Sequence, residues 1–284
     1  MPMRWRTLIR VDELARRLDA CVVVDCRHDL TNPAYGPAAW ADAHLPGAFF
    51  LHQDHDLAGE RTGTNGRHPL PEREALRRKL ESIGLADGVQ LVAYDENGGM
   101  YASRLWWLAR WLGHSEVAVL DGGLPAWRAA GHALTSEPPV ARARGALTLH
   151  APRTAQVDAA QVLAQLGTDR PRVVDARTPE RWRGEVEPLD PVAGRIPGSV
   201  NRPYTENLQP DGRFKSADEL RTEFLALLDG REASALIHQC GSGVTACHNL
   251  LAMEIAGLPG AALYPGSWSE WCADPERPVA VGAA

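Results

Sequence analysis

The chain has 284 residues, a formal net charge of −6 at pH 7, 44% hydrophobic residues and 23% charged residues. This length suits two domains of ordinary size, and the composition is that of a soluble globular protein. No apolar run is long enough to cross a membrane and no dense basic tract suggests nucleic-acid binding, so we expect small-molecule partners.

The N-terminal residues indicate the cellular compartment, and the cysteines indicate whether disulfides or zinc stabilise the fold. The N-terminal residues lack the apolar core of a signal peptide, so we expect a cytoplasmic protein. The cysteines are odd in number and lack CxxC spacing, which argues against a disulfide framework and a structural zinc site. No metal or organic cofactor is expected. The five cysteines are Cys21, Cys26, Cys240, Cys247 and Cys272.

In the first half of the chain, short β-branched runs alternate with helical periodicity. The runs at 21–25, 89–94 and 117–120 predict buried strands, and the segment 104–112 predicts a helix that ends at Gly113. Strands that alternate with helices usually form a parallel sheet, so we expect an α/β domain whose sheet has helices on both faces.

The second half repeats this order after an aperiodic segment that contains several prolines. It predicts strands at 172–175, 235–239 and 262–264 and a helix at 249–256 that ends at Gly257. We therefore predict two domains joined by a linker. The predicted bounds are 1–137 for the first domain, 138–155 for the linker and 156–284 for the second domain.

Matching landmarks in the two halves indicate an internal repeat. They follow the same order and are separated by nearly constant shifts, which is not expected by chance. Each half therefore contains one copy of the same structural unit. The pairs of matching segments are 23–27 with 173–177, 44–48 with 195–199, 99–102 with 243–246, and 121–124 with 265–268.

Cys240 is the strongest indication of chemistry in the sequence. It lies between a predicted strand and a predicted helix, in a loop that reads Cys-Gly-Ser-Gly-Val-Thr. Gly241 and Gly243 allow successive backbone N–H groups to turn toward one point, and the helix adds the positive end of its dipole. Such a loop stabilises a thiolate and can hold a persulfide or an anion. Cys240 is therefore the predicted nucleophile, whereas Cys247 is expected to pack inside the helix.

The first half has Asp95 at the position of Cys240, in a loop that is one residue longer. A carboxylate cannot carry transferable sulfur, so we expect the first domain to be inactive in this chemistry. We expect it to form a wall of an active-site cleft at the domain interface. Asp175 and Arg177 recur in the half without the cysteine, which favours a structural ion pair.

The order of these motifs resembles the tandem rhodanese family of sulfurtransferases over nearly the whole chain. The matching motifs are the Asp-x-Arg after the first strand, the x-Pro-Gly-Ala/Ser turn, the Cys loop and the Gly-Gly or Gly-Ser turn before Trp. The resemblance implies two tandem rhodanese-like domains. It also implies that Cys240 takes up sulfane sulfur as a persulfide and passes it to a thiol, cyanide or a thioredoxin-like acceptor.

The residues after the cysteine suggest the sulfur donor. Thiosulfate enzymes of this family commonly have Arg-Lys there, whereas 3-mercaptopyruvate enzymes have Gly-Ser, which Gly241 and Ser242 match. A thiosulfate dianion benefits from two cations beside the sulfur, whereas mercaptopyruvate carries one carboxylate and a thiol that must lose its proton. The resemblance therefore implies a 3-mercaptopyruvate sulfurtransferase.

Substrate-binding residues are also implied by the resemblance. Arg181 matches one of two arginines placed around the carboxylate and keto oxygen of mercaptopyruvate. The expected place of the second falls around 189–190, which is not basic, and Arg195 or Arg183 could substitute for it. The loop residues expected to bind substrate are Gly241, Gly243, Val244 and Thr245.

A Ser-His-Asp relay is implied for the proton of the donor thiol. Ser242 matches by its place in the loop, and His68 matches the His of a His-x-Leu-Pro segment. The acid is expected upstream, with Asp54 the nearest candidate and Asp56 the alternative.

Three other functions were compared with this one. Thiosulfate sulfurtransferase uses the same fold, but the loop lacks the two cations that would favour it. A cysteine-dependent phosphatase needs an arginine after a Cys-x5 loop, and the sixth residue after Cys240 is Ala246. A persulfide carrier that serves only a protein partner is the third alternative, and the sequence leaves it open.

Overall fold

The computed structural model describes residues 4–168 and 172–283, and the chain divides into two compact units. Unit 1 contains the chain up to Gly59 together with Pro71–Arg153 and Pro210–Phe214, and unit 2 contains Glu60–Leu70, Thr154–Gln209 and the chain from Lys215 onward. Three segments thus group differently from the predicted domain bounds, one of them Pro210–Phe214, which lies with unit 1. Glu60–Leu70 lies with unit 2, and most of the predicted linker packs with unit 1.

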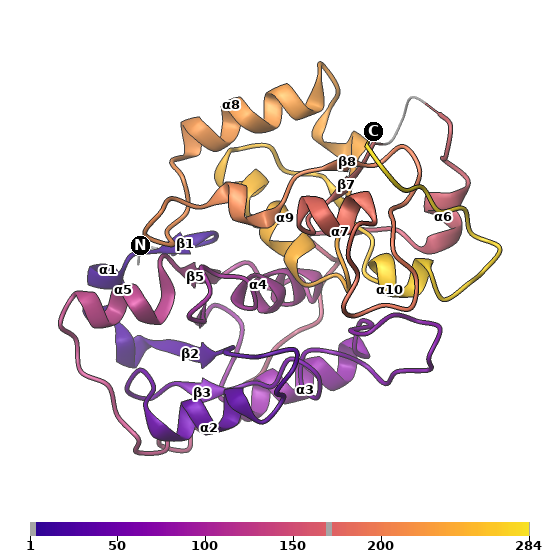
Figure 1. The fold of residues 1–284 in the computed structure, drawn as a ribbon. Helices are drawn as coiled ribbons and strands as arrows, with labels where there is room; N and C mark the ends of the chain where they lie inside the picture. The colour runs from indigo at the N-terminus through magenta and orange to yellow at the C-terminus, as the bar shows by residue number, and fades with distance from the viewer. Residues whose placement is uncertain (1–3, 169–171, 284) are drawn as a thin grey trace. The chain divides into compact units, whose positions relative to one another are not determined.

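Unit 1 is a five-stranded parallel sheet with the strand order β1-β5-β4-β2-β3 (Figure 1). Its strands are β1 (Leu8–Ile9), β2 (Cys21–Asp25), β3 (Phe49–Phe50), β4 (Gln90–Tyr94) and β5 (Val117–Leu120). Its helices are α1 (Val11–Ala15), the 3-10 helix η1 (Leu18–Ala20), α2 (Tyr35–Asp42), α3 (Arg73–Ser82), α4 (Ala102–Trp111) and α5 (Gly123–Ala129).

Helices cover both faces of this sheet. Every residue of β2, β4 and β5 is buried, as expected for central parallel strands with both faces packed. Residues of α1 and α5 join alternate residues of these strands in one hydrophobic cluster, and α4 packs against β4 and β5. The central strand β4 therefore ends in a buried setting, directly before Asp95.

Unit 2 repeats this topology with the strand order β6-β10-β9-β7-β8, again with parallel pairing. Its strands are β6 (Ala155–Gln156), β7 (Arg172–Asp175), β8 (Val200–Asn201), β9 (Leu236–Gln239) and β10 (Ala262–Leu263). Its helices are α6 (Ala159–Leu163), α7 (Pro179–Arg183), η2 (Tyr204–Asn207), α8 (Ala217–Leu228), η3 (Ala233–Ala235), α9 (Thr245–Ile255) and α10 (Ser267–Trp271).

The core of unit 2 is built in the same way as that of unit 1. Residues of α6 and α10 pack on one face of the sheet, including the fully buried Trp268 and Trp271. The helix α9 packs against β9 and β10, and α8 packs against α9. Cys240 follows the central strand β9, in the position that Asp95 has after β4.

The expected α/β class, the parallel sheets and the internal repeat are confirmed. The predicted strands at 21–25, 117–120 and 172–175 have the observed bounds, while the helix expected at 249–256 begins earlier, at Thr245. Among the helices of the described residues, none combines the length and the apolar character needed to cross a bilayer.

Candidate active site

Cys240 lies on a tight loop between β9 and α9. Its side chain is 2% exposed, and its Sγ accepts a hydrogen bond from the N–H of Gly243 at 3.1 Å. Gly243 has a positive φ of 78°, and a Cβ there would lie 2.4 Å from the carbonyl oxygen of Pro265. Both conditions require glycine at this position. The loop therefore points a backbone N–H at the sulfur of Cys240.

Helix α10 holds the backbone of this loop in place. The N–H of Cys240 donates to the Oγ of Ser267 at 3.1 Å, and its carbonyl accepts from the N–H of Trp268 at 3.0 Å. Ser267 itself has a φ of 55°, in the left-handed region that side chains rarely adopt. These bonds fix the backbone on both sides of the Cys240 Cα.

Ser242 and His68 form a buried hydroxyl–imidazole pair beside the cysteine. The Nδ1 of His68 lies 2.7 Å from the Oγ of Ser242, and the two residues are 1% and 5% exposed. They are far apart in the sequence but both belong to unit 2. This geometry allows proton exchange between the two side chains.

Two guanidinium groups flank the residue that follows the cysteine. A Cβ on Gly241 would lie 2.8 Å from the Nη2 of Arg67 and 3.4 Å from the Nη2 of Arg181. Arg181 projects from α7, and the N–H of Arg67 donates to the Oγ of Ser269 at 3.0 Å. Arg67 was not predicted from the sequence. Its place directly before His68 was the available signal, because a side chain next to a site histidine is carried to the same site.

Acids pair with both of these arginines. Arg181 contacts Glu187 at 2.6 Å and Asp190 at 3.5 Å, and Arg67 forms an ion pair with Asp190. The side chains of Glu187 and Asp190 are 2% and 4% exposed. The site is therefore a network of alternating charges in which the acids are buried and the two arginines are partly exposed.

The expected ion pair of Asp175 and Arg177 is present and buried, with a shortest contact of 2.7 Å. Burial alone would lower the pKa of Arg177, but the carboxylates of Asp175 and Glu187 outweigh it and raise this pKa. Asp25 and Arg27 form the same pair in unit 1, also at 2.7 Å. The pair thus supports the fold in both copies.

Arg195 and Arg183 have partners away from the cysteine loop. Arg195 donates to the carbonyl oxygen of Gly282 at 2.6 Å, and its guanidinium lies 4.3 Å from the ring centroid of Trp182. Arg183 pairs with Glu185 at 2.6 Å on a partly exposed surface. These contacts hold both side chains in place without involving the Cys240 loop.

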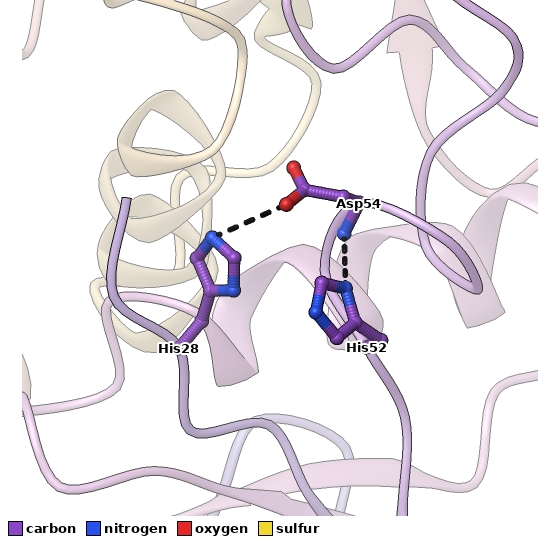
Figure 2. A group of neighbouring side chains, drawn as sticks. All are labelled: His28, His52 and Asp54. Carbon is purple, nitrogen blue, oxygen red and sulfur yellow. Dashed lines mark hydrogen bonds and ion pairs between the residues drawn. The ribbon is translucent and has the colours of Figure 1, made fainter. Parts of the chain in front are cut away.

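Asp54 belongs to unit 1 and lies close to two histidines (Figure 2). Its Oδ2 is 3.7 Å from the Nε2 of His28, and its N–H donates to the Nδ1 of His52 at 3.0 Å. The alternative acid, Asp56, pairs with Lys79 at 2.6 Å.

The cluster of His28, His52 and Asp54 brings its ligand atoms within 4.8 Å of one another, as a metal site would. However, the Nδ1 of His52 accepts the N–H of Asp54, and its Nε2 lies 3.0 Å from the carbonyl oxygen of Pro33. The Nδ1 atom must be unprotonated to accept the first hydrogen bond, and the Nε2 atom must carry the proton to donate the second. Both nitrogens of the neutral ring therefore take part in hydrogen bonds. The hydrogen bonds therefore leave His52 no lone pair for a metal ion.

The equivalent loop of unit 1 is filled by its own carboxylate. Asp95 is fully buried and accepts four backbone N–H groups. Burial raises the pKa of Asp95, and these hydrogen bonds oppose that rise. The donors are Asn97 at 2.9 Å, Gly99 at 2.9 Å, Tyr101 at 2.8 Å and Ala102 at 2.9 Å.

Comparison with known proteins identifies the family. The profile of the rhodanese-like domain matches residues 10–130 and 158–274. The chain is 47% identical to the "Probable 3-mercaptopyruvate sulfurtransferase" of Pseudomonas aeruginosa over 97% of this chain and 98% of that protein. It is 37% identical to the thiosulfate sulfurtransferase of Bos taurus over 98% of this chain and 96% of that protein.

A solved structure agrees with these sequence matches. The 3-mercaptopyruvate sulfurtransferase SseA from Escherichia coli superposes with a TM-score of 0.79 and 30% identity, covering 94% of this chain and 99% of the other. The resemblance expected from the motifs is thereby confirmed. The chain belongs to the rhodanese family and contains two copies of its domain.

Proposed function

We propose that this sulfurtransferase moves sulfane sulfur from 3-mercaptopyruvate to an acceptor through a persulfide on Cys240. The observation that carries the proposal is the loop itself. It combines a buried thiol on the N–H of Gly243, the pair of Ser242 and His68, and two guanidinium groups beside Gly241. The 47% identity to the P. aeruginosa protein, named for the mercaptopyruvate reaction, supports this donor.

In the first half-reaction, the Cys240 thiolate attacks the sulfur of mercaptopyruvate. The Cys–S bond forms as the bond between carbon and sulfur breaks, and pyruvate leaves as its enolate. Ser242 and His68 accept the proton of the donor thiol and return it to the enolate carbon. The products are pyruvate and the Cys240 persulfide.

Arg181 and Arg67 are proposed to bind the carboxylate and keto oxygen of the donor, because guanidinium N–H groups match both oxygens. Arg67 thus takes the role for which Arg195 was expected. The backbone of Gly241, Gly243, Val244 and Thr245 is proposed to hold the outer sulfur of the persulfide.

In the second half-reaction, an acceptor thiolate or cyanide attacks the outer sulfur, and Cys240 leaves as a thiolate. We propose a small thiol or a thioredoxin-like protein in the cytoplasm as the physiological acceptor.

The test is thiocyanate formation from cyanide with mercaptopyruvate and with thiosulfate as parallel donors, for the native protein and Cys240→Ser. We expect kcat/KM to favour mercaptopyruvate by at least about tenfold and both activities to vanish in the variant. A preference for thiosulfate would overturn the donor assignment. Cys272→Ser is the matched control, since this buried cysteine lies after α10 and is expected to leave activity intact. Turnover only with an added protein acceptor would favour the carrier function instead.

A further inference from the structure

Two buried carboxylates lie against the guanidinium groups that flank the Cys240 loop. Asp190 forms an ion pair with the Nη1 of Arg67, and its Oδ2 is 3.5 Å from the Nη2 of Arg181. Glu187 contacts the Nη2 of Arg181 at 2.6 Å and the Nη1 of Arg177 at 3.3 Å. Each arginine of this network therefore has an acid on one side.

The formal charges of the network cancel. Three arginines face three acids, and three positive charges less three negative charges leave zero. An uncompensated charge acts strongly in such a buried site, because the effective dielectric constant is far below that of water. The residues counted are Arg67, Arg177 and Arg181 against Asp175, Glu187 and Asp190.

Hydrogen-bond donors nevertheless remain on the side of the loop. The Nη2 of Arg67 and the Nη1 of Arg181 lie 2.8 Å and 3.5 Å from the place of a Cβ on Gly241. Among residues 4–168 and 172–283, neither nitrogen donates a hydrogen bond to an acid, and the buried Nε of Arg67 has no hydrogen-bond partner. The network therefore offers directed N–H groups to a ligand without a surplus of positive charge.

We propose that Asp190 determines the charge of the sulfur donor that this site accepts. It neutralises one of the two cations beside Gly241, so a donor with one carboxylate binds through hydrogen bonds, whereas a dianion such as thiosulfate lacks the second positive charge it needs. Asp190 is the acid placed for this role, since it alone contacts both Arg67 and Arg181 in the described network. The inference rests on the proposed function and explains how its donor preference arises.

The test compares Asp190→Asn with the native protein. The substitution removes one negative charge with little change in shape. We expect the ratio of kcat/KM for thiosulfate to that for mercaptopyruvate to rise by about tenfold, chiefly through a lower KM for thiosulfate. Asp190→Glu, which keeps the charge, should restore the native ratio. An unchanged or lower ratio in Asp190→Asn would overturn the proposal.

Glu185→Gln is the matched control. It removes the same charge nearby, but Glu185 is 55% exposed and pairs with Arg183. The ratio should stay within about twofold of the native value, because exposed charges are screened by solvent. An equal effect in both variants would mean that net charge, and not Asp190, controls donor choice.

A binding measurement separates this inference from the proposed function. In the Cys240→Ser background, calorimetry with thiosulfate and with pyruvate reports dianion and monoanion affinity without turnover. Adding Asp190→Asn should lower the dissociation constant for thiosulfate about tenfold relative to that for pyruvate. If the native protein turns over neither donor, the proposed function fails while this ratio still tests Asp190. Should Asp190→Asn fold poorly, Asp190→Ser takes its place with the same expected shift, and no shift in that variant would reject the proposal.

Discussion

The loops after β4 and β9 have equivalent positions in the two units, but the first residue is Asp95 in one and Cys240 in the other. Each follows the central strand of a parallel sheet. The carbonyl of its first residue accepts an N–H from the start of the helix that follows the neighbouring strand, from Leu124 of α5 in unit 1 and from Trp268 of α10 in unit 2. The Asp95 carboxylate takes four N–H groups, whereas the Cys240 sulfur takes one, from Gly243. In both units the loop therefore directs backbone N–H groups toward the side chain of its first residue.

The side chain of this first residue determines the chemistry that each loop allows. In unit 1 the carboxyl group is part of the chain and fully buried, so the loop is a structural element. In unit 2 the sulfur of Cys240 accepts one backbone N–H, from Gly243, and the proposed persulfide would add a second sulfur atom in this loop.

The proton relay should matter only for a donor with a thiol proton. Ser242→Ala and His68→Asn should each lower kcat/KM for mercaptopyruvate about 100-fold, because the buried pair of Ser242 and His68 is proposed to receive the proton. Thiosulfate has no thiol proton, so its slower turnover should change by less than about threefold. Steady-state kinetics with both donors check this, and equal losses with the two donors would refute the relay.

Removal of the internal anion should destabilise unit 1. Asp95→Ala leaves four buried N–H groups without their acceptor, so the free energy of unfolding should fall by about 3 kcal/mol. Asp95→Asn keeps one oxygen and should lose less. Urea unfolding followed by circular dichroism measures both variants, and native stability in Asp95→Ala would contradict the idea that the loop requires an anion.

The central strand β9 contains a buried histidine that should make the stability of the protein sensitive to acid, whereas β4 has no titratable residue at the matching position. His238 on β9 pairs with Val174, whereas Ala93 on β4 has the matching position beside Val24. Burial lowers the pKa of His238 from 6.5 to about 3. Below pH 6.5 the unfolded chain therefore binds a proton at His238 that the folded protein does not bind. The stability that the neutral histidine contributes is fully present above pH 6.5 and is lost as the pH falls toward 3.

This pH effect can be isolated with one variant. Between pH 6.5 and 5 the native protein should lose about 2 kcal/mol more stability than His238→Leu. Urea unfolding at several pH values provides the comparison. Parallel curves for the two proteins would show that His238 does not carry the acid sensitivity.

The smallest expected effect concerns the residue that opens α10. Ser267 and its counterpart Gly123 both have a φ of 55°, but the Ser267 hydroxyl also accepts the N–H of Cys240. Ser267→Ala loses that bond and keeps the strain, so we expect a loss of about 2 kcal/mol, whereas Ser267→Gly relieves the strain and should lose about 1 kcal/mol. Thermal unfolding ranks the two variants, and the reverse order would argue that the hydroxyl does not hold the loop.

The repeat and the central strands were predictable because apolar β-branched runs mark them clearly. The edge strands β3 and β8 were not predicted, since each has only two residues and their hydrogen bonding depends on the neighbouring strand. The start of α9 was placed too late, because the glycines of the loop obscure where helical geometry begins.

The site was predictable only in part for a physical reason. Cys240 and Ser242 share one loop whose spacing indicates its chemistry. Arg67 and Asp190 are brought beside that loop by the fold from distant segments, so the motif around Cys240 does not mark them, and only the position of Arg67 next to His68 gave a signal. Charge networks of this kind depend on tertiary distances and become visible only in the structure.

The most direct test of the central claim is mass spectrometry of the Cys240 peptide after reaction of the protein with mercaptopyruvate. We predict the gain of one sulfur atom on Cys240, its loss when a thiol acceptor is added, and no gain on Cys247. Cys240 unchanged during turnover, or sulfur carried by another cysteine, would contradict the claim that the Cys240 loop is the sulfur-carrying counterpart of the Asp95 loop.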